Sequence, residues 1–546
     1  MSANMQLKKI IAIIILLCFV GVGYYCFYPA INIHQQGIWL VLLLLFALLF
    51  MIGMIARGSE RQAPYFVVVI KHIREIPLFS RVFACLTLLT VILFLLGELA
   101  GATLFRARSY AGLLPVEERV FEEDIAESNR ITDIALMDTK SARIFGNRKI
   151  GSLSDVVSQF EVQQDYTQIA IQGKPMKVSG LKYASFFKWW NNRKNGIPGY
   201  IKVDPTNSEA EYVKLDRGMR YVPSGFFNDN LQRHVQLKYP TKIIDGYHFE
   251  LDDEGNPYYI CPTKTAKIGL FDGMDINGVI ICDPVSGDCQ YYDVKDCPSW
   301  VDSVYSGKLL TQKYNWYGML SDGYFNSVFE QKGCKRATDD FGYKIIKDDV
   351  WVYTGVTSVN GDKSNIGFIM MNQRTSEARF YQVSGAEEHS AMKAAEGEVQ
   401  EKGYKASFPS LVNVAGIPTY VMVLKDSGGL VKLYAMVNVE QYNIVATATT
   451  QSKVFENYTK LLQSKGNTEI QESDQKEETI TVTDIQYIDT EDGVMVYLKD
   501  DAHQVYKQAF KENESLIKIS VGDRLQVKYY EGADGIHSLL EFVIME

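Results

Sequence analysis

Three long apolar runs near the N-terminus constrain the fold of this chain more than any other feature. They cover residues 10–27, 38–56 and 82–105, and Glu98 is the only charged residue within them. Each is close to the ~20 residues that an α-helix needs to cross the ~30 Å hydrocarbon layer of a bilayer. A helix at the surface of a soluble domain would carry a polar face, and these runs have none. We therefore expect three transmembrane helices in an anchor of residues 1–109, with a cleaved signal peptide as the alternative for the first run.

Charge in the connecting loops predicts an orientation. Lys8 and Lys9 precede the first run, the loop 28–37 is uncharged, and the loop 57–81 carries five Lys and Arg residues. The positive-inside rule places the N-terminus and the second loop in the cytoplasm. The expected location is the cell membrane, with several spans and with residues after about 105 extracytoplasmic.

The remainder of the chain is acidic and rich in apolar residues. Residues 1–109 carry +6 and the whole chain carries −9, so residues 110–546 carry −15. Nucleic-acid binding rests on neutralising phosphates, so no nucleic-acid partner is expected. Hydrophobic residues make up 47% of the chain, which argues against disorder.

A hairpin pattern recurs after residue 150. Each copy begins with glycine and four mostly apolar residues, continues with Asp or Asn and a short turn, and ends in an aromatic-rich strand. The copies cover residues 199–213, 278–293 and 367–383, with a degenerate fourth at 433–445. Asp or Asn between runs of strand formers predicts a β-hairpin. We expect an α+β ectodomain, with an acidic stalk at 110–150 and tandem modules of antiparallel hairpins and helices at 151–464.

The C-terminal region has a different pattern. Residues 465–478 are polar and almost free of large apolar side chains, which predicts a linker. Residues 479–546 contain five short strand patterns, with Gly522 and Asp523 before the fourth. These resemble a small OB-like β-barrel.

The hairpin and several longer segments carry resemblances to known families. The strand–Asp-x-x-(Thr/Ser)–strand hairpin beside a helix, over residues 181–446, resembles PepSY-type repeats, which are extracytoplasmic modules linked to protease inhibition or regulation. With NRKIGSLSDVVSQFEV at 147–162, NWYG at 315–318 and VWVYTGVTSV at 350–359, the whole chain is similar to uncharacterised bacterial three-span membrane proteins, some loosely labelled colicin-V-production-like. That resemblance implies a topology and supplies no catalytic residue.

Glu98 is the most unusual residue of the predicted anchor. A carboxylate inside hydrocarbon costs about 2.5 kcal/mol or more. Gly97 and Gly101 flank it in a Gly-x-x-x-Gly pattern that allows helices to approach closely. Two interpretations stay open: a site that protonates or binds a partner helix, and a carboxyl near the outer end that reaches interfacial water.

Cysteines outside the apolar runs suggest one disulfide. Cys282 and Cys289 flank a predicted hairpin turn and could face each other across it. Five cysteines lie in this region, and five is odd, so at least one is free or pairs between chains: Cys261, Cys282, Cys289, Cys297 and Cys334. The alternative is that all five are reduced.

Other candidate sites are weaker. Ser390 and Lys393 fit the Ser-x-x-Lys pattern of acyl-enzymes, but the same spacing occurs at 179–182 and 185–188 without the accompanying motifs, so chance explains it. The histidines are scattered, and no metal site or cofactor-binding loop is expected. Phe186, Trp189 and Trp190 are candidates for an aromatic binding platform, with a core role as the alternative.

These observations favour a membrane-anchored extracytoplasmic scaffold or adaptor over an enzyme. Its expected partners are membrane lipid, other envelope proteins and copies of itself. One alternative is a cell-envelope enzyme or a regulator of a protease or cell-wall enzyme, with Ser390 and Lys393 as the only nameable pair. Another is an accessory subunit of a transport or secretion complex, for which Glu98 is the only indication.

Overall fold

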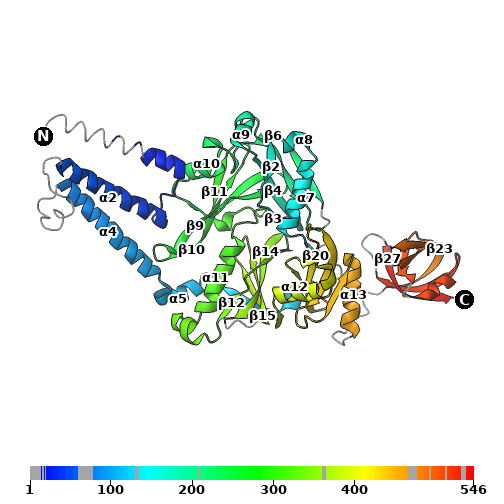
Figure 1. Ribbon diagram of the computed structural model, residues 1–546. Coiled ribbons are helices and arrows are strands. Elements are labelled where there is room, and N and C mark those ends of the chain that lie inside the picture. Colours follow the sequence, from blue (N-terminus) through cyan, green and yellow to red (C-terminus); the bar gives the residue numbers. More distant parts are fainter. Residues whose placement is uncertain are drawn as a thin grey trace. The chain divides into compact units, whose positions relative to one another are not determined.

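The protein is a mixed α/β chain of two compact units, Met1–Leu461 and Leu462–Glu546. The computed structural model (Figure 1) describes the following residues: 14, 18, 20–58, 78–128, 134–206, 209–359, 364–464, 476–490, 493–510, 513–530 and 536–545. Most of the predicted linker at 465–478 lies outside them. Each unit has a hydrophobic core of its own.

Two long apolar helices near the N-terminus pack side by side. They are α2 (Gln36–Gly58) and α4 (Leu78–Gly101), and both are long and apolar enough to cross a membrane. They run antiparallel, because Gln36 meets Glu98 at one end and Gly53 lies against Ser80 at the other. Of the first predicted span, residues 20–27 are helical, while most of 10–19 lies outside the described residues.

The third predicted span ends earlier than expected. Helix α4 stops at Gly101, Ala102 adopts extended backbone angles, and α5 (Thr103–Ala111) begins in a new direction. Arg106 and Arg108 belong to α5. The long apolar helix α4 therefore carries neither of these basic side chains.

Four modules with the same topology follow. Each has a helix and then five strands, of which the first two both pair with the third, and the third, fourth and fifth form an antiparallel meander. Module one is α7 (Thr139–Gly151), β2 (Phe160–Val162), β3 (Thr167–Ile171), β4 (Lys174–Tyr183), β5 (Ile197–Val203) and β6 (Ala210–Met219). Module two is α10 (Leu231–Lys238), β7 (Ile243–Ile244), β8 (His248–Leu251), β9 (Pro257–Ile268), β10 (Asp272–Cys282) and β11 (Cys289–Tyr292).

The other two modules repeat this order. Module three is α11 (Gly307–Leu320), β12 (Lys335–Ala337), β13 (Gly342–Ile346), β14 (Asp349–Ser358), β15 (Ser364–Asn372) and β16 (Ala378–Tyr381). Module four is α12 (Glu388–Gly397), β18 (Lys405–Ala406), β19 (Ser410–Val414), β20 (Ile417–Lys425), β21 (Val431–Asn438) and β22 (Val445–Ala448), followed by α13 (Gln451–Ser464). All four predicted hairpins therefore exist, including the degenerate fourth copy.

One side chain shapes the turn of each repeated hairpin. The side-chain oxygen of the Asp or Asn accepts a hydrogen bond from the backbone N–H two or three residues later, at 2.7–2.8 Å: Asp204, Asp283, Asn372 and Asn438. This Asx turn fixes where the strand ends and so sets the register of the strand that returns.

The repeated glycine has a steric cause. A Cβ on Gly199 or Gly367 would collide with the backbone oxygen of the neighbouring strand, and one on Gly278 would collide with the ring of Tyr291. The strand register shifts beside each of these glycines, by three residues at Gly199 and by one at Gly278 and Gly367. A bulge brings the backbones close together, and only glycine fits there.

The sheets share cores, so both faces of the middle sheets are buried. Along β9, Tyr259 and Cys261 face a core shared with module one, whereas Ile260 between them faces a core shared with module three. Module three shares its other face with module four. The central strands are therefore apolar on both faces, unlike those of a sheet with one solvated face.

The segment 110–150 does not form a separate stalk. Its strand β1 (Val116–Arg119) adds to the edge of module three in parallel with β16, and Glu127 forms a β-bridge with Asn413 of module four. Phe121 and Ile125 are buried in the core between these modules. The acidic side chains alternate with these apolar residues and lie mostly on the outside, which explains why composition alone suggested a stalk.

The C-terminal unit is a closed five-stranded barrel. Its strands follow the order β23-β24-β25-β27-β26, and β26 closes on β23. They are β23 (Lys476–Thr490), β24 (Gly493–Asp500), β25 (Val505–Ala509), β26 (Arg524–Tyr530) and β27 (Ile536–Met545). The five strand patterns in the sequence are thus confirmed.

Replacing Gly367 by alanine tests the bulge. We expect the free energy of unfolding of the Met1–Leu461 unit to fall by about 1–3 kcal/mol, because the new methyl group has no room beside the Tyr381 backbone. Urea unfolding of the detergent-solubilised protein, followed by tryptophan fluorescence, measures this. Gly397→Ala is the control: nothing lies within 4 Å of its Cβ position and α12 ends there, so stability should be unchanged or slightly raised.

Candidate functional site

The first candidate site is the junction between the apolar helices and module two. The tip of the β9–β10 hairpin, residues 269–271, lies against the end of α4. The Phe271 ring sits 5.9 Å from the Trp39 ring and 5.0 Å from the Phe94 ring, measured between centroids. A Cβ on Gly97 would lie 2.8 Å from Phe271, so this glycine is what allows the ring to enter.

Gly97 and Gly101 therefore have a different neighbour from the one predicted. Both are buried, and they face the hairpin tip of module two where the sequence suggested a second helix. The backbone of Gly101 lies against Gly269, and a side chain on Gly101 would collide with the Asp272 carboxylate. The small-residue pattern correctly indicated close packing and could not identify the partner.

Glu98 is half-buried one turn before the end of α4. Its Oε1 accepts a hydrogen bond from Gln36 Nε2 at 2.8 Å, which joins the start of α2 to the end of α4. This contact supplies the carboxylate with a polar partner within the chain, whichever interpretation of its role holds.

The connection before α2 is tied to module two as well. Ile31 N–H donates to the Pro240 carbonyl at 2.7 Å, and Asn32 Nδ2 donates to the Thr241 carbonyl at 2.8 Å. His34 Nδ1 lies 2.8 Å from the carbonyl oxygen of Leu270 in the hairpin tip. The N-terminal end of α2 and the C-terminal end of α4 therefore meet the same module.

Helix α5 strengthens the junction from the other side. Tyr110 is buried and its hydroxyl donates to the Gly101 carbonyl at 2.9 Å. Its ring stacks edge-on against Trp316 of α11, with 5.0 Å between centroids. Burial and the nearby Asp272 carboxylate raise the pKa of Tyr110 to about 12, so the hydroxyl stays a donor at neutral pH.

The second candidate site is the cysteine pair of module two. Cys282 and Cys289 are directly opposite each other on β10 and β11, as the turn spacing predicted. Their sulfurs are 3.0 Å apart, and both are free thiols. Cys282 is fully buried, whereas Cys289 is half-buried.

Two basic side chains from α10 accompany this pair. His234 and Lys238 are one helical turn apart, so they share a face of the helix. His234 Nε2 lies 2.7 Å and Lys238 Nζ 2.6 Å from the Gly287 carbonyl oxygen in the hairpin turn. A ring nitrogen of His234 and both sulfurs lie within 4.8 Å of one another.

The two thiols differ in their acidity. The hydrogen bond between the two thiols lowers the pKa of Cys289; burial opposes this, and His234 and Lys238 lower the pKa further. The same hydrogen bond and burial raise the pKa of Cys282. Burial favours neutral His234, but its contacts with Cys289 and the Gly287 carbonyl raise its pKa overall. Of the two thiols, Cys289 is therefore the one that ionises more readily.

Sequence reasoning identified the cysteines and missed their helix partners. His234 and Lys238 lie far from Cys282 in the chain, and no local motif connects them. The only sequence signal for these partners is the i, i+4 spacing of His234 and Lys238, which places both basic side chains on one face of a helix.

The Ser390 and Lys393 pair is not assembled as an acyl-enzyme site would require. Ser390 Oγ donates to Glu387 Oε1 at 3.5 Å, and Lys393 is exposed on the same helix. Within the part of the chain that the structure describes, no hydrogen bond joins the two side chains.

The aromatic cluster divides between core and surface. Trp189 is buried in the core of module one, while Phe186 is 37% and Trp190 47% exposed. Phe226 packs against both Phe186 and Trp189, at 5.0 and 5.4 Å between centroids, which widens the exposed aromatic surface. The core alternative therefore holds for Trp189 only.

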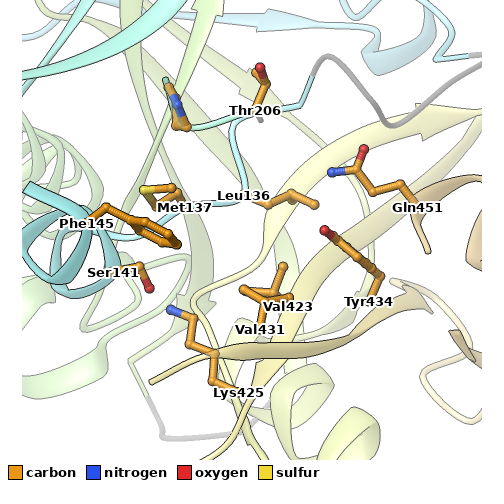
Figure 2. A pocket seen from close by; sticks show the side chains of 11 residues that line it. Leu136, Met137, Ser141, Phe145, Thr206, Val423, Lys425, Val431, Tyr434 and Gln451 are labelled. Carbon is orange, nitrogen blue, oxygen red and sulfur yellow. The ribbon is translucent and has the colours of Figure 1, made fainter. Parts of the chain in front are cut away.

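A small pocket lies between modules one and four (Figure 2). Side chains from α7, β20 and β21 point into it. Lys425 is its charged lining group, and its Nζ is 2.7 Å from the Asp138 carboxylate at the start of α7. Because this ion pair ties the modules together, the pocket is a structural junction.

Replacing Gly97 by valine tests the docking of the hairpin tip. The added methyl groups would displace Phe271 and Leu270, so amide hydrogen exchange at residues 268–272 should accelerate at least tenfold, as read by mass spectrometry. Gly23→Val is the matched control, because nothing lies within 4 Å of its Cβ position. Unchanged exchange in Gly97→Val would contradict the docking described here.

Comparison with known proteins adds no assignment to this geometry. No protein-family model matches the chain, and no curated protein sequence matches it. The resemblances to PepSY-type repeats and to three-span bacterial membrane proteins therefore stay predictions.

Proposed function

We propose that this protein is a membrane-anchored extracytoplasmic scaffold, on which the four modules present a fixed surface to other envelope proteins or to a second copy. One observation carries the proposal: module two is fastened to both apolar helices at the same end, through Phe271 and the residues before α2. Because of this attachment, the four modules move together with the apolar helices.

The repeat architecture supports the same function. Modules that share cores with their neighbours form an extended body whose stability adds along the array, and such bodies commonly serve as binding platforms. Exposed Phe187 (74%) and Trp190 (47%) give module one a surface of the aromatic kind that interfaces favour. Fold alone does not assign a partner, which the experiment below has to supply.

The proposed topology has three spans with the N-terminus in the cytoplasm. Both described apolar helices have their ectodomain-side ends at module two, and the basic loop 57–81 connects their opposite ends. The positive-inside rule then assigns that loop to the cytoplasm and the modules to the outside. On this topology Glu98 lies near the outer surface, where Gln36 and interfacial water are its neighbours.

For the C-terminal barrel we propose an OB-like fold. In chain order its strands pair 1-2-3-5-4-1, the third and fifth are parallel, and a short helix, Glu514–Lys518, lies between the third and fourth. This is the arrangement expected of a five-stranded Greek-key barrel. We assign it a protein-docking role, since the ectodomain is acidic.

Affinity purification from native membranes after mild cross-linking tests the scaffold. We expect the wild-type chain to recover an envelope protein, or itself, in near-stoichiometric amount. The Gly97→Val variant should recover less of this partner, because its modules are held less firmly by the apolar helices. The Gly23→Val variant should recover as much as the wild type. No stoichiometric partner and no self-association would refute the scaffold, and labelling of Ser390 by an acyl-serine probe would favour the enzyme alternative.

A further inference from the structure

We propose that Cys282 and Cys289 form a thiol–disulfide exchange site, with Cys289 as the attacking thiolate, Cys282 as the resolving thiol and a disulfide-bonded protein as the substrate class. This activity goes beyond the scaffold role and does not depend on it. It rests on the placement of two sulfurs and two cationic side chains in module two.

The geometry permits both redox states of the pair. Directly opposed residues on antiparallel strands have Cα atoms about 4.5–5.5 Å apart, within the range that a disulfide needs. The sulfurs, now 3.0 Å apart, would approach by about 1 Å to form a bond. Side-chain rotation supplies that movement, so oxidation does not require the strands to separate.

The other modules show that the fold does not need thiols at this place. The cross-strand pair that corresponds to Cys282 and Cys289 is Val203 with Ala210 in module one, Met371 with Ala378 in module three and Val437 with Val445 in module four. Three apolar pairs serve the same packing position. The two thiols are therefore specific to module two and are not explained by packing.

The surroundings select Cys289 as the nucleophile. It is half-buried while Cys282 has no exposed surface, so an incoming disulfide reaches Cys289 first. Lys238 places positive charge beside it, and the raised pKa of His234 adds to this effect; both favour the thiolate. The titratable groups that face Cys289 from the packed elements are Cys282 on β10, Cys261 on β9, His234 and Lys238 on α10, and Tyr239 after α10.

The reaction balances without a further cofactor. The Cys289 thiolate attacks one sulfur of the substrate disulfide, a new S–S bond forms, and the second substrate sulfur leaves as a thiolate with the electron pair of the broken bond. The Cys282 thiol then gives its proton to the substrate thiolate released in the first step and attacks the Cys289 sulfur, so that the first substrate sulfur leaves as a thiolate. The pair is oxidised to a disulfide, and the substrate disulfide is reduced to one thiol and one thiolate, which takes its proton from solvent.

A zinc site is a poorer account of the same residues. Tetrahedral zinc with Zn–S bonds of about 2.3 Å holds two thiolate sulfurs about 3.8 Å apart, further than the 3.0 Å seen here. Among the described residues, His234 supplies only one further ligand to this cluster. Tight binding of zinc at this cluster would therefore overturn the proposal.

The test uses the full-length protein in detergent, reduced and freed of reductant, with dithiobis(nitrobenzoate) as the disulfide probe. The reference is the double variant C282V/C289A, which carries the Val203 and Ala210 pair of module one and should keep the wild-type unfolding midpoint. Relative to it, the wild type should release two further equivalents of nitrothiobenzoate. Cys282→Ser should release one and retain a mixed disulfide on Cys289, identified by mass mapping.

The pH dependence separates an activated thiolate from an ordinary thiol. Between pH 8 and pH 6 the reaction at Cys289 should slow less than threefold, whereas an ordinary thiol slows about a hundredfold. In the His234→Gln and Lys238→Gln variants, the rate at pH 6 should fall at least tenfold below the wild type. A pair that stays oxidised in excess glutathione, equal release from Cys282→Ser and the double variant, or one tightly bound zinc per chain would each overturn the proposal.

Discussion

The hydrogen bond between an Asp or Asn side chain and the backbone just beyond it is the interaction on which the four modules depend. It ends the fourth strand of each module at Asp204, Asp283, Asn372 or Asn438 and turns the chain back antiparallel. A slip of one residue would exchange the two faces of the returning strand. Since the middle sheets are buried on both faces, such a slip would disturb two cores at once.

Module two differs from the other modules in the length of its β9–β10 hairpin. Strands β9 and β10 have 12 and 11 residues, more than the corresponding strands of any other module. The added length carries the tip with Phe271 to the apolar helices, where Gly97 leaves room for the ring. Extension of a repeated hairpin, without a new element, thus creates the attachment to the apolar helices.

The sequence predicted what depends on neighbouring residues. Apolar length located α2 and α4, and the glycine–Asp pattern located the hairpins, because helix spans and tight turns are set by side chains within a few positions. What the sequence did not reveal depends on contacts between distant segments. Three such contacts join residues far apart in the chain, so no local pattern encodes them. They are the pairing of β1 with β16, the packing of the β9–β10 hairpin against Gly97, and the approach of His234 to Cys289.

Strand β10 connects the two candidate sites. It begins at Asp272 beside Gly101 and ends at Cys282, and 11 extended residues span roughly 35 Å. Both of its faces are packed, so it cannot bend without disturbing the cores shared with modules one and three. In the proposed topology the thiol pair is therefore held at a nearly constant height above the membrane. For the proposed exchange reaction, a substrate disulfide has to reach the thiol pair at that distance from the apolar helices.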